Sequence, residues 1–416
     1  MNRPRVSITR LLVGPVLVCA NLCVGLACVY GQAGPLPLQD SDIKRFTTFY
    51  DGKRVIHIPA GVYIVDRAII LPSDTVLEGA GPATVLRASS GFRGSRFISN
   101  SDLTRGNANI TLRSFLVEFA TKVFGGETGV IRFENVENLQ IEEVSMDLNT
   151  SMYGIDLAAH VRDSTIQGCT IVNKGGGGGI MVRNRNVSPT CATSGVEISS
   201  NRITSFVDEP IAVFGWMGVV HNIRVEQNEI DAQDASFGIT VYGIDQIKHT
   251  GTIEGVIVSG NRVRGGRVGG IAVKGGARNV ELTGNVIDGQ RADAIFLHTG
   301  GEGLPGVSNV IIRGNKLTNA GRHCIFASGN ALTIQDNSIS NCREAGIYVG
   351  GPASVIGNAI RDAKPGMLVT VKGPKVIREN RVISSSGIIV LSNDRSGISD
   401  NIIEQSSQPA LPKRPE

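Results

Sequence analysis

The sequence is poor in aromatic residues and lacks the residue patterns of several common sites. Phe, Tyr and Trp account for 5% of the 416 residues, and Trp216 is the single tryptophan. No His, Cys and Asp residues have the spacing of a metal site, and no Gly-x-Ser-x-Gly segment marks a nucleophilic serine. The glycine run at 175–179 lacks the Lys-Ser/Thr of a phosphate-binding loop. The sequence therefore gives no case for a metal centre, a serine hydrolase or a nucleotide site.

A strong excess of charge of one sign is also missing. The formal net charge is +4, and it falls to +1 without Arg3, Arg5 and Arg10, because no acidic residue precedes Asp40. A nearly neutral chain has no general electrostatic attraction for nucleic acid or for a membrane surface. We therefore expect neither as a partner.

The first 33 residues have the features of a secretory signal peptide. Three arginines precede an apolar run from Leu11 to Tyr30, and Gly31-Gln32-Ala33 supplies small residues for cleavage after Ala33. Two alternatives stay open, an uncleaved membrane anchor and a lipoprotein modified at Cys28. We expect a secreted, periplasmic or cell-surface protein.

Few cysteines remain once the leader is set aside, namely Cys169, Cys191, Cys324 and Cys342. An even number in an exported protein permits disulfides. Both cysteines follow members of a repeating asparagine series. Cys324 lies nine residues after Asn315, whereas Cys342 lies five residues after Asn337, so the two cysteines are not at equivalent positions of successive repeats. This comparison predicts buried free thiols.

Asparagine recurs through the second half of the chain, each time followed two residues later by Ile, Val or Leu. The series is Asn201, Asn228, Asn261, Asn285, Asn315, Asn337, Asn358, Asn380 and Asn401, with gaps of 27, 33, 24, 30, 22, 21, 22 and 21 residues. Self-similarity at such a period marks a solenoid. Residues at the same offset from successive asparagines should therefore stack.

A second repeat, Gly-Ile-x-Val, follows most of these asparagines. Examples are 179–182, 238–241, 270–273, 346–349 and 387–390, and two weaker units upstream carry Cys169 and Val144 in the asparagine position. Strands of three to five residues with 21–22 residues per turn give about three strands per coil, each paired in parallel with the next coil. Asparagine suits the bend because it tolerates the left-handed conformation, and stacked asparagines can hydrogen-bond to one another.

These patterns predict an all-β chain, a single-stranded parallel β-helix (solenoid) with about three short strands per coil. We expect a signal peptide at 1–33, a linker and cap at 34–53, the β-helix at 54–404 and a disordered tail at 405–416. Within the cap, 41–50 is predicted to be a short helix with Ser41 or Asp42 as its N-cap. Strands are predicted within 55–65 and 68–81.

The repeats resemble those of the pectin-lyase-like superfamily of right-handed parallel β-helices. The segments I-P-A-G-V-Y-I-V (58–65) and L-P-S-D-T-V-L-E-G-A-G (71–81) are similar to its N-terminal coils, and the resemblance covers nearly the whole mature chain. It implies the fold and a polysaccharide partner. It leaves the activity open, since the superfamily includes lyases, hydrolases, epimerases, tailspikes and adhesins.

The site motifs of the superfamily's best-known enzymes are mostly absent. The pectin-hydrolase set and the calcium-lyase pattern do not occur. Tyr153-Gly154-Ile155-Asp156-Leu157 resembles the start of the alginate C5-epimerase motif Tyr-Gly-Phe-Asp-Pro-His, but the histidine is missing and Met181 stands where a second aspartate is expected one coil on. Tyr153-Gly154 is equally compatible with one more Gly-Ile strand.

Unequal spacing points to the region of a site. Between Cys169 and Asn315 the coils are enlarged, mostly by residues 184–194, 215–222, 243–254 and 299–308, whereas the later coils are minimal. Insertions on one side of a solenoid usually line its binding face. We expect a groove there, with neutral variation in loop length as the alternative.

Outward positions of the Gly-Ile-x-Val strands supply the candidate residues, because Ile and Val alternate inward. The fifth residues of successive coils are Arg183, Phe214, Tyr242, Lys274 and His298, with Trp216 just beyond; carboxylates nearby are Asp156, Glu209 and Asp293. Aromatic rings can stack on sugars, and Arg or Lys can pair with uronate carboxylates. The alternative is an ordinary solvated face.

These residues favour a polysaccharide lyase or C5-epimerase-like enzyme acting on a uronate-containing glycan. Arg183 or Lys274 would neutralise the substrate carboxylate, while Tyr242, Lys274 or His298 would transfer the proton. Substrate-binding residues would be Phe214, Trp216, Asp156, Glu209 and Asp293. A non-catalytic glycan-binding or adhesin-type module is the alternative, followed by a glycoside hydrolase. No cofactor is indicated, and calcium dependence and oligomeric state stay open.

Overall fold

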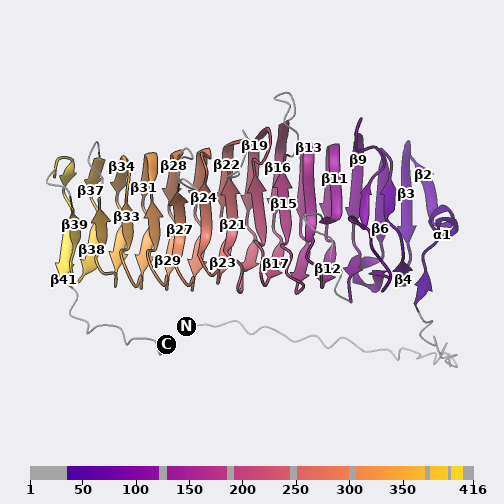
Figure 1. Cartoon of the computed structure of the whole chain (residues 1–416), viewed down its shortest axis with the longest axis horizontal. Coiled ribbons are helices and arrows are strands. Elements are labelled where there is room, and N and C mark those ends of the chain that lie inside the picture. Colours follow the sequence, from indigo (N-terminus) through magenta and orange to yellow (C-terminus); the bar gives the residue numbers. More distant parts are fainter. Residues whose placement is uncertain are drawn as a thin grey trace, which may run out of the picture. The chain divides into compact units, whose positions relative to one another are not determined.

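Short strands joined by tight turns build a stack of coils in which each strand pairs with its equivalent one coil away (Figure 1). The computed structural model describes residues 35–120, 129–184, 192–243, 251–298, 306–370, 375–391 and 395–405. The expected signal peptide and almost all of the expected tail lie outside these residues. Within the described part, no helix is long and apolar enough to cross a membrane.

The first ladder contains fifteen strands, all paired in parallel, and follows the asparagine turns. Its strands are β1 (Leu36–Pro37), β4 (Gly61–Val65), β7 (Thr84–Ala88), β10 (Leu116–Glu118), β12 (Ser145–Leu148), β14 (Thr170–Asn173), β17 (Arg202–Ser205), β20 (Glu229–Asp231), β23 (Arg262–Arg264), β26 (Val286–Asp288), β29 (Lys316–Thr318), β32 (Ser338–Ser340), β35 (Ala359–Arg361), β38 (Arg381–Ser384) and β41 (Ile402–Gln405). Gln405, predicted to begin the disordered tail, is instead the last residue of β41 because it pairs with Ser384.

The second ladder contains the Gly-Ile-x-Val strands. They are β5 (Ile69–Leu71), β8 (Ile98–Asn100), β15 (Ile180–Arg183), β18 (Ile211–Phe214), β21 (Phe237–Tyr242), β24 (Gly269–Lys274), β27 (Asp293–His298), β30 (Ile325–Ala327), β33 (Ile347–Val349), β36 (Met367–Val369) and β39 (Ile388–Val390). The long strands β11 (Gly129–Glu142) and β13 (Tyr153–Gln167) begin in this ladder and continue around a corner into the third.

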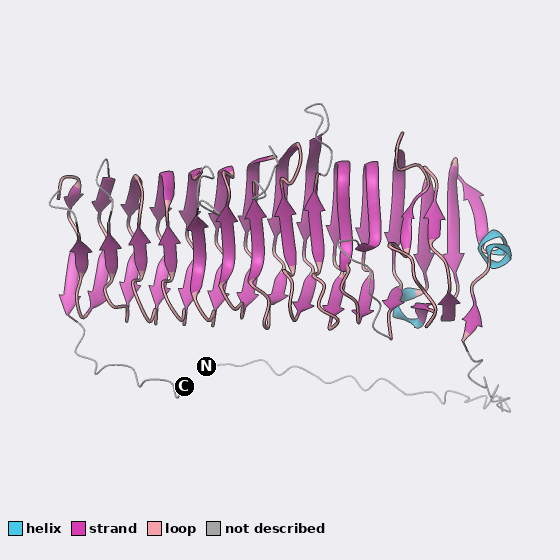
Figure 2. Ribbon diagram, in the orientation of Figure 1, coloured by secondary structure: helices cyan, strands magenta, loops and turns pink. Residues whose placement is uncertain are grey.

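The third ladder precedes the asparagine turns. It contains β3 (Lys53–Ile58), β6 (Thr75–Gly79), β9 (Asn107–Arg113), β16 (Ala192–Ser199), β19 (Val219–Glu226), β22 (Thr252–Ser259), β25 (Arg278–Thr283), β28 (Val307–Arg313), β31 (Gly329–Gln335), β34 (Ala353–Ile356), β37 (Lys375–Arg378) and β40 (Ile398–Ser399). A hairpin strand, β2 (Thr47–Tyr50), pairs antiparallel with β3 at the start of the stack. The predicted β-helix of three strands per coil is therefore confirmed (Figure 2).

Helix is confined to two short segments near the N-terminal end, α1 (Asp40–Arg45) and the 3-10 turn η1 (Gly81–Ala83). The predicted helix at 41–50 is wrong in both bounds. Gln39 is the N-cap, and its backbone N–H donates to the Asp42 carboxylate at 3.0 Å. The helix ends early because 47–50 pair with β3 as a strand.

The asparagine series forms a continuous buried hydrogen-bonded ladder. At each step the side-chain oxygen of one asparagine accepts both the backbone N–H and the side-chain N–H of the asparagine one coil before, as Asn285 does for Asn261 at 3.0 Å. The side-chain nitrogen also donates to a backbone carbonyl of the previous coil, as Asn285 Nδ2 does to Val258 at 2.9 Å. The predicted side-chain stacking is confirmed.

Asparagine itself does not adopt the left-handed conformation that was expected of it. The residue before it does, with φ of 56° at Ser200, 56° at Gln227, 64° at Gly260 and 55° at Asp336. The asparagine is held by its side-chain bonds, while its predecessor makes the bend. Glycine and short polar residues dominate that preceding position because they tolerate positive φ.

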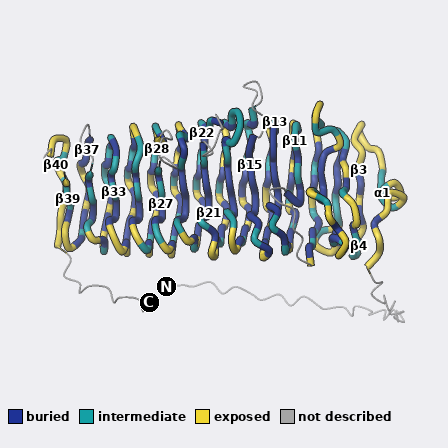
Figure 3. The backbone as a smooth tube through the Cα atoms, viewed as in Figure 1, coloured by how far each residue is buried: buried dark blue, intermediate teal, exposed yellow. Residues whose placement is uncertain are grey.

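Aliphatic side chains from all three ladders fill the interior. The Ile and Val of each Gly-Ile-x-Val strand point inward as predicted; for example, Ile239 and Val241 are fully buried. Figure 3 shows buried positions repeating along the stack, with exposed positions more frequent at its two ends. Ile402 and Ile403 in the last strand are 59% and 52% exposed.

Cys324 and Cys342 form a disulfide, with their Cα atoms 5.5 Å apart. The prediction of free thiols is therefore wrong for this pair. Offsets from the asparagine compare residues on the same side of successive coils, but these cysteines occupy opposite ends of the turn between the first and second ladders. Cys324 closes that turn before β30, whereas Cys342 opens the equivalent turn one coil later, after β32. Cys169 is a buried free thiol.

The enlarged coils owe part of their extra length to longer strands. In the third ladder β16, β19 and β22 each have eight residues, whereas β34 and β37 have four. Much of three predicted loop insertions, at 184–194, 243–254 and 299–308, lies outside the described residues. Residues 219–222, assigned to an insertion, belong to β19 because they pair with β16 and β22.

Candidate functional site

The fifth residues of the Gly-Ile-x-Val strands stack in register, because parallel pairing keeps equal offsets opposite each other. Arg183 pairs with Phe214, Phe214 with Tyr242, Tyr242 with Lys274, and Lys274 with His298. The sequence therefore places these five residues on one line across five coils, as expected.

Four of the five line a cavity of about 320 Å³, which we call the tyrosine pocket. Its lining residues come from the second ladder and the turns on either side of it: Tyr153, Met181, Arg183, Asp208, Glu209, Phe214, Trp216, Tyr242 and Lys274. Tyr153, Met181 and Ala212 form a small apolar cluster apart from the main core, and Phe214 packs against it. The pocket thus combines an apolar cluster with charged side chains.

Aromatic rings and cations alternate along the pocket wall. The Phe214 and Tyr242 rings meet edge to face, with centroids 6.0 Å apart. Lys274 Nζ lies 4.7 Å from the Phe237 ring centroid and 5.0 Å from that of Tyr242, while Arg183 Cζ lies 5.7 Å from the Trp216 ring. Cation–π contacts of this kind fix a charged group against a ring, so the wall is preorganised.

Arg183 and Asp156 bind each other in a buried bidentate ion pair. Arg183 Nε donates to Asp156 Oδ1 at 2.9 Å and Nη2 donates to Oδ2 at 2.6 Å, with side-chain exposures of 1% and 0%. Neither residue belongs to an ordinary solvated face. The charge of Arg183 is balanced by a protein carboxylate, so the geometry favours a role in shaping the pocket over the predicted neutralisation of a substrate carboxylate. Asp156 is likewise removed from direct contact with a ligand.

Acidic groups gather at the opposite end of the strands. The Asp208 carboxylate accepts the backbone N–H of Glu209 at 2.9 Å, and the Tyr153 and Glu209 side chains lie close enough to Asp208 for its charge to raise the pKa of both. Burial, followed by the Asp208 hydrogen bond and charge, raises the pKa of Glu209 to about 8. Glu209 is therefore a protonated acid at neutral pH beside a carboxylate, an arrangement typical of sites that transfer protons.

A glycine makes this cluster sterically possible. Gly178 lies one coil before Glu209, and a Cβ there would meet Tyr153 Cε1 at 2.2 Å and the Glu209 carbonyl oxygen at 2.4 Å. Without a side chain at 178, the Tyr153 ring reaches across to the two carboxyl groups. Burial and the neighbouring Asp208 and Glu209 charges raise the pKa of Tyr153, which keeps its hydroxyl protonated.

Lys274 is the counterpart to this acid cluster. Burial lowers the pKa of Lys274, and the Glu209 charge acts against that shift. A half-buried lysine with a lowered pKa supplies more of the neutral amine that a general base requires. The pocket thus holds a proton donor and a base that are both shifted toward neutral pH.

Two predicted site residues, His298 and Asp293, lie apart from the pocket. The His298 ring packs on Phe296 and Phe326, with centroids 5.4 and 6.1 Å away. Asp293 is fully buried, and its Oδ1 accepts a hydrogen bond from the backbone N–H of His323 at 3.1 Å. His298 pairs in register with Lys274, yet neither His298 nor Asp293 lines the pocket. The sequence did not indicate that Phe296 and Phe326 stack on each other beside His298.

Two residues that line the tyrosine pocket, Asp208 and Tyr153, were not predicted as site residues from the sequence. Asp208 was not considered, although it is adjacent to Glu209 just before a Gly-Ile-type strand; this pair of neighbouring acids was the available signal. Tyr153 was treated as part of one more strand, which it is. Its ring reaches the site only because a glycine follows one coil later. No group of three or more His, Cys, Asp or Glu side chains that could hold a metal ion occurs in the described ranges.

Comparison with known families gives two matches that follow one another along the chain. Residues 50–229 match the model described as rhamnogalacturonase A/epimerase, pectate lyase-like, and residues 242–407 match the right handed beta helix region. The first match includes the carboxyl groups of the tyrosine pocket, and the second begins at Tyr242.

Among curated proteins, the pre-neck appendage protein of Bacillus phage phi29 is 24% identical over 366 residues. The match covers 86% of this chain, and the chain spans 40% of the length of that relative. The solved structure of the pre-mature phi29 gene product 12 has a TM-score of 0.53 at 18% identity, covering 85% of this chain and 54% of that one.

An enzyme has a similar backbone over almost its full length. The DFA-IIIase of Arthrobacter chlorophenolicus A6, solved without its lid in complex with GF2, has a TM-score of 0.51 at 13% identity. The alignment covers 89% of this chain and 94% of that one. Identities this low establish the fold alone, a fold that carbohydrate-active proteins share. Together with the two family matches and the parallel ladders, they show that the chain belongs to the pectin-lyase-like superfamily of right-handed parallel β-helix proteins.

Proposed function

We propose that the chain is a glycan-processing enzyme of the lyase or C5-epimerase type, acting on a uronate in the tyrosine pocket. The observation that carries this proposal is that Glu209, an acid with a raised pKa, and Lys274, a half-buried lysine with a lowered pKa, line one aromatic cavity. Phe214 and Trp216 supply flat apolar surface for a sugar ring. The fold supports a polysaccharide partner, as it does in the carbohydrate-active relatives.

The proposed chemistry begins with the C5 hydrogen of a uronate, which the adjacent carboxyl group makes acidic. The Lys274 amine takes this proton. In elimination, the C4–O4 bond then breaks, a C4–C5 double bond forms, and the leaving oxygen receives the Glu209 proton. In epimerisation no bond to oxygen breaks, and Glu209 returns a proton to C5 on the opposite face. Burial and the Asp208 charge favour the protonated form of that acid.

A glycoside hydrolase fits the geometry less well. Hydrolysis by paired carboxyl groups requires a separation of about 5–5.5 Å for retention or about 6.5–9.5 Å for inversion. Asp208 and Glu209 are adjacent in the chain, and the Asp208 carboxylate accepts the Glu209 backbone N–H at 2.9 Å; Asp156 is held by Arg183. The third carboxylate suggested by the sequence, Asp293, does not line the pocket.

A non-catalytic glycan-binding module is the second candidate. Its support is the similarity over 86% of the chain to a phage pre-neck appendage protein, since a virion appendage can recognise a surface glycan without altering it. The same aromatic pocket would then bind sugar and release it unchanged.

The decisive experiment incubates the protein with alginate, polygalacturonate and similar glycans, following unsaturated uronide absorbance and C5 configuration by NMR. Lys274→Ala and Glu209→Gln should each lower turnover by roughly 10²–10⁴-fold, the usual contribution of a proton-transfer group. Lys316→Ala is the matched control, because Lys316 is an exposed lysine on the first ladder. Normal turnover in Lys274→Ala would rule out this assignment.

Binding measurements separate the two candidates. Glycan affinity that is lost in Trp216→Ala, with no product under any condition, would support the binding module. Release of reducing ends without unsaturation would instead indicate hydrolysis.

Export is part of the same proposal, because a polysaccharide of this class is met outside the cytoplasm. The expected signal peptide at 1–33 supports it. Mass spectrometry of the secreted or periplasmic protein should find the mature N-terminus at Gly34, and an intact N-terminus would favour the membrane-anchor alternative.

A further inference from the structure

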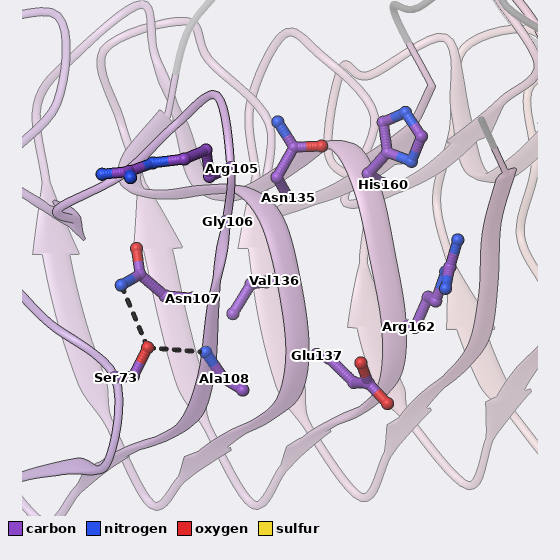
Figure 4. Close-up of a pocket in the computed structure, with 10 residues that line it drawn as sticks. All are labelled: Ser73, Arg105, Gly106, Asn107, Ala108, Asn135, Val136, Glu137, His160 and Arg162. Carbon is purple, nitrogen blue, oxygen red and sulfur yellow. Dashed lines mark hydrogen bonds between the residues drawn. The ribbon is translucent and has the colours of Figure 1, made fainter.

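A second cavity, of about 380 Å³, lies where β11 and β13 turn from the second ladder into the third. Its lining comes from four successive coils: Ser73, Arg105, Gly106, Asn107, Ala108, Asn135, Val136, Glu137, His160 and Arg162. We call it the arginine pocket. None of these residues lines the tyrosine pocket. Figure 4 shows Arg105, Asn135 and His160 across one side of the cavity and Ser73, Ala108 and Glu137 along the other.

The loop that carries Arg105 is fastened to the coils by side chains. Asn107 Oδ1 accepts the backbone N–H of Asp102 at 2.8 Å, and Asn107 Nδ2 donates to Ser73 Oγ at 3.2 Å. Asn135 Nδ2 donates to the carbonyl of Leu103. Asp102 in turn accepts a hydrogen bond from Arg105 Nε at 2.8 Å. The loop is therefore fastened to the coils, while the Arg105 guanidinium is exposed and pairs with Asp102.

Backbone conformation also defines the corner. Asn135 and His160, which occupy equivalent corners one coil apart, have φ values of 49° and 50°. Positive φ recurs at the turns of this chain, including residues that precede the ladder asparagines, so here it marks a sharp corner of the coil. The bend places both side chains at the rim of the cavity.

The chemistry of the lining favours an anion. Arg162 presents a guanidinium group, His160 an imidazole and Asn135 an amide, and Glu137 is the one carboxylate among the described lining residues; Arg105 adds a second guanidinium whose charge is shared with Asp102. Burial lowers the pKa of His160, and the Arg162 charge lowers it further. Arg162 thus lies close enough to His160 for its charge to act on that imidazole, and guanidinium groups match the planar oxygen pairs of carboxylates and the oxygens of phosphates.

We propose that the arginine pocket binds an oxyanion carried by a glycan, and that it is a second contact for the polymer handled in the tyrosine pocket. The identity of the polymer rests on the proposed function, whereas the oxyanion site does not. Glu137 pairs in register with Arg162 across adjacent strands, so it limits the net positive charge and favours one anionic group over a dense polyanion.

One strand connects the two pockets. Tyr153 at the start of β13 lines the tyrosine pocket, and His160 and Arg162 further along β13 line the arginine pocket. At about 3.3 Å per residue, seven residues around a corner separate the two by a distance on the order of 20 Å. A glycan of several sugars could reach both, and simultaneous contact would raise the affinity for long chains above that for short ones.

The test measures binding of uronate oligomers of increasing length by calorimetry. An Arg105→Ala/Arg162→Ala variant should lose about tenfold or more in affinity for long oligomers, consistent with losing two charge-assisted hydrogen bonds, and little for a disaccharide. Arg313→Ala, an exposed arginine on β28 of the third ladder, should bind like the wild type. Equal affinities in the double variant and the wild type would overturn the proposal.

A second readout identifies the site independently of activity. The His160 imidazole resonance, assigned by comparison with His160→Gln, should shift on addition of the monosaccharide glucuronate or of inorganic phosphate, and a neutral glucose oligomer should leave it in place. A shift with phosphate but not with glucuronate would assign the site to phosphorylated polymers. No shift with either anion would refute the anion site, even if turnover in the tyrosine pocket is confirmed. A shift without any turnover would support the anion site and contradict the proposed activity.

Discussion

The enlarged coils between Cys169 and Asn315 and the minimal coils from Asn315 onward share one scaffold but differ on the outer face of the second ladder. In four of the enlarged coils the third residues of the strands are buried on that face, with exposures of 4% at Met181 and 0% at Ala212, Thr240 and Ala272; Phe296 in β27 is partly exposed and stacks on Phe326. In the minimal coils the equivalent Phe326 and Tyr348 are partly exposed and stack on each other, with ring centroids 4.6 Å apart.

The asparagine ladder is the same in both regions. Its hydrogen bonds are 2.8–3.1 Å long in both regions, from Asn201 to Asn401. The scaffold and the site are therefore specified by different side chains of the same coil. Inward residues and asparagines set the fold, and a solenoid can alter its outer columns coil by coil because each coil contacts only its neighbours.

Filling the space at Gly178 should have the largest effect that distinguishes the regions. A Gly178→Val side chain would collide with the Tyr153 ring and the Glu209 carbonyl, so we expect a fall in glycan affinity or turnover of over 100-fold, with roughly 1–3 kcal/mol of destabilisation from overpacking. Isothermal binding and chemical denaturation measure the two effects.

Gly366→Val is the matched control in the minimal coils, since a Cβ there would lie 2.1 Å from Val382 Cγ1. It should destabilise the fold similarly and leave affinity per folded molecule unchanged. If both variants lost binding equally, the pocket would have no special dependence on Gly178.

Removing the disulfide should weaken the minimal coils and spare the pocket. The Cys324–Cys342 bond closes a loop with a sequence separation of 18, for which loss of the cross-link costs about 3 kcal/mol. Cys324→Ala/Cys342→Ala should lower the denaturation midpoint, and reductant should do the same to the wild type. An unchanged midpoint in both would show that the bond does not contribute, and lost turnover would show that the two regions are coupled.

Stability should depend on pH through two acids of the enlarged coils, Glu209 and Asp293. The folded-state pKa is raised to about 8 for Glu209, from 4.5, and to about 6 for Asp293, from 3.8. Because the folded protein favours the protonated forms, this stabilisation is complete below the unfolded values and is lost as pH rises through the folded values.

Denaturation of the wild type across these pH windows should show the two losses separately. Glu209→Gln should flatten the curve between pH 4.5 and about 8, and Asp293→Asn should flatten it between pH 3.8 and about 6. The same titration of Glu209 should reduce turnover above about pH 8. Identical pH curves for Glu209→Gln and the wild type would contradict the raised pKa.

The smallest expected effect is a gain in stability. Cys169 occupies the asparagine position of its coil, where its N–H donates to Asn201 Oδ1 at 2.9 Å. Cys169→Asn would extend the ladder by side-chain bonds to Asn201 and to the carbonyl of Ile141, and should raise the free energy of unfolding by about 1 kcal/mol. Cys169→Ala is the control and should not stabilise; a loss of stability in Cys169→Asn would mean that this first ladder coil cannot hold an amide.

Sequence periodicity predicted the fold and the alignment of the pocket because both depend on equal offsets. Parallel pairing conserves the offset from the asparagine, so Arg183, Phe214, Tyr242 and Lys274 could be placed on one line without coordinates. The same reasoning failed for the disulfide, which joins unequal offsets across a turn.

Side-chain partners were less predictable than backbone positions. Asp156 and Arg183 were both expected to point outward from the β-helix. They do, but they form an ion pair with each other, and neighbouring side chains cover both of them. Asp208 and Tyr153 enter the site through a turn and a missing side chain at Gly178, neither of which repeats along the chain. A feature that occurs once leaves no periodic signal.

The asparagine ladder also has an electrical polarity. From Asn201 to Asn380 each side-chain amide donates to the asparagine of the next coil, so the amide dipoles of the series point the same way, eight of them in a buried, weakly polarisable interior. Chains of hydrogen bonds in such surroundings polarise one another. The β-helix thus contains an internal row of aligned dipoles whose negative end faces the N-terminal coils, and removing one amide from the middle would divide it into two shorter rows.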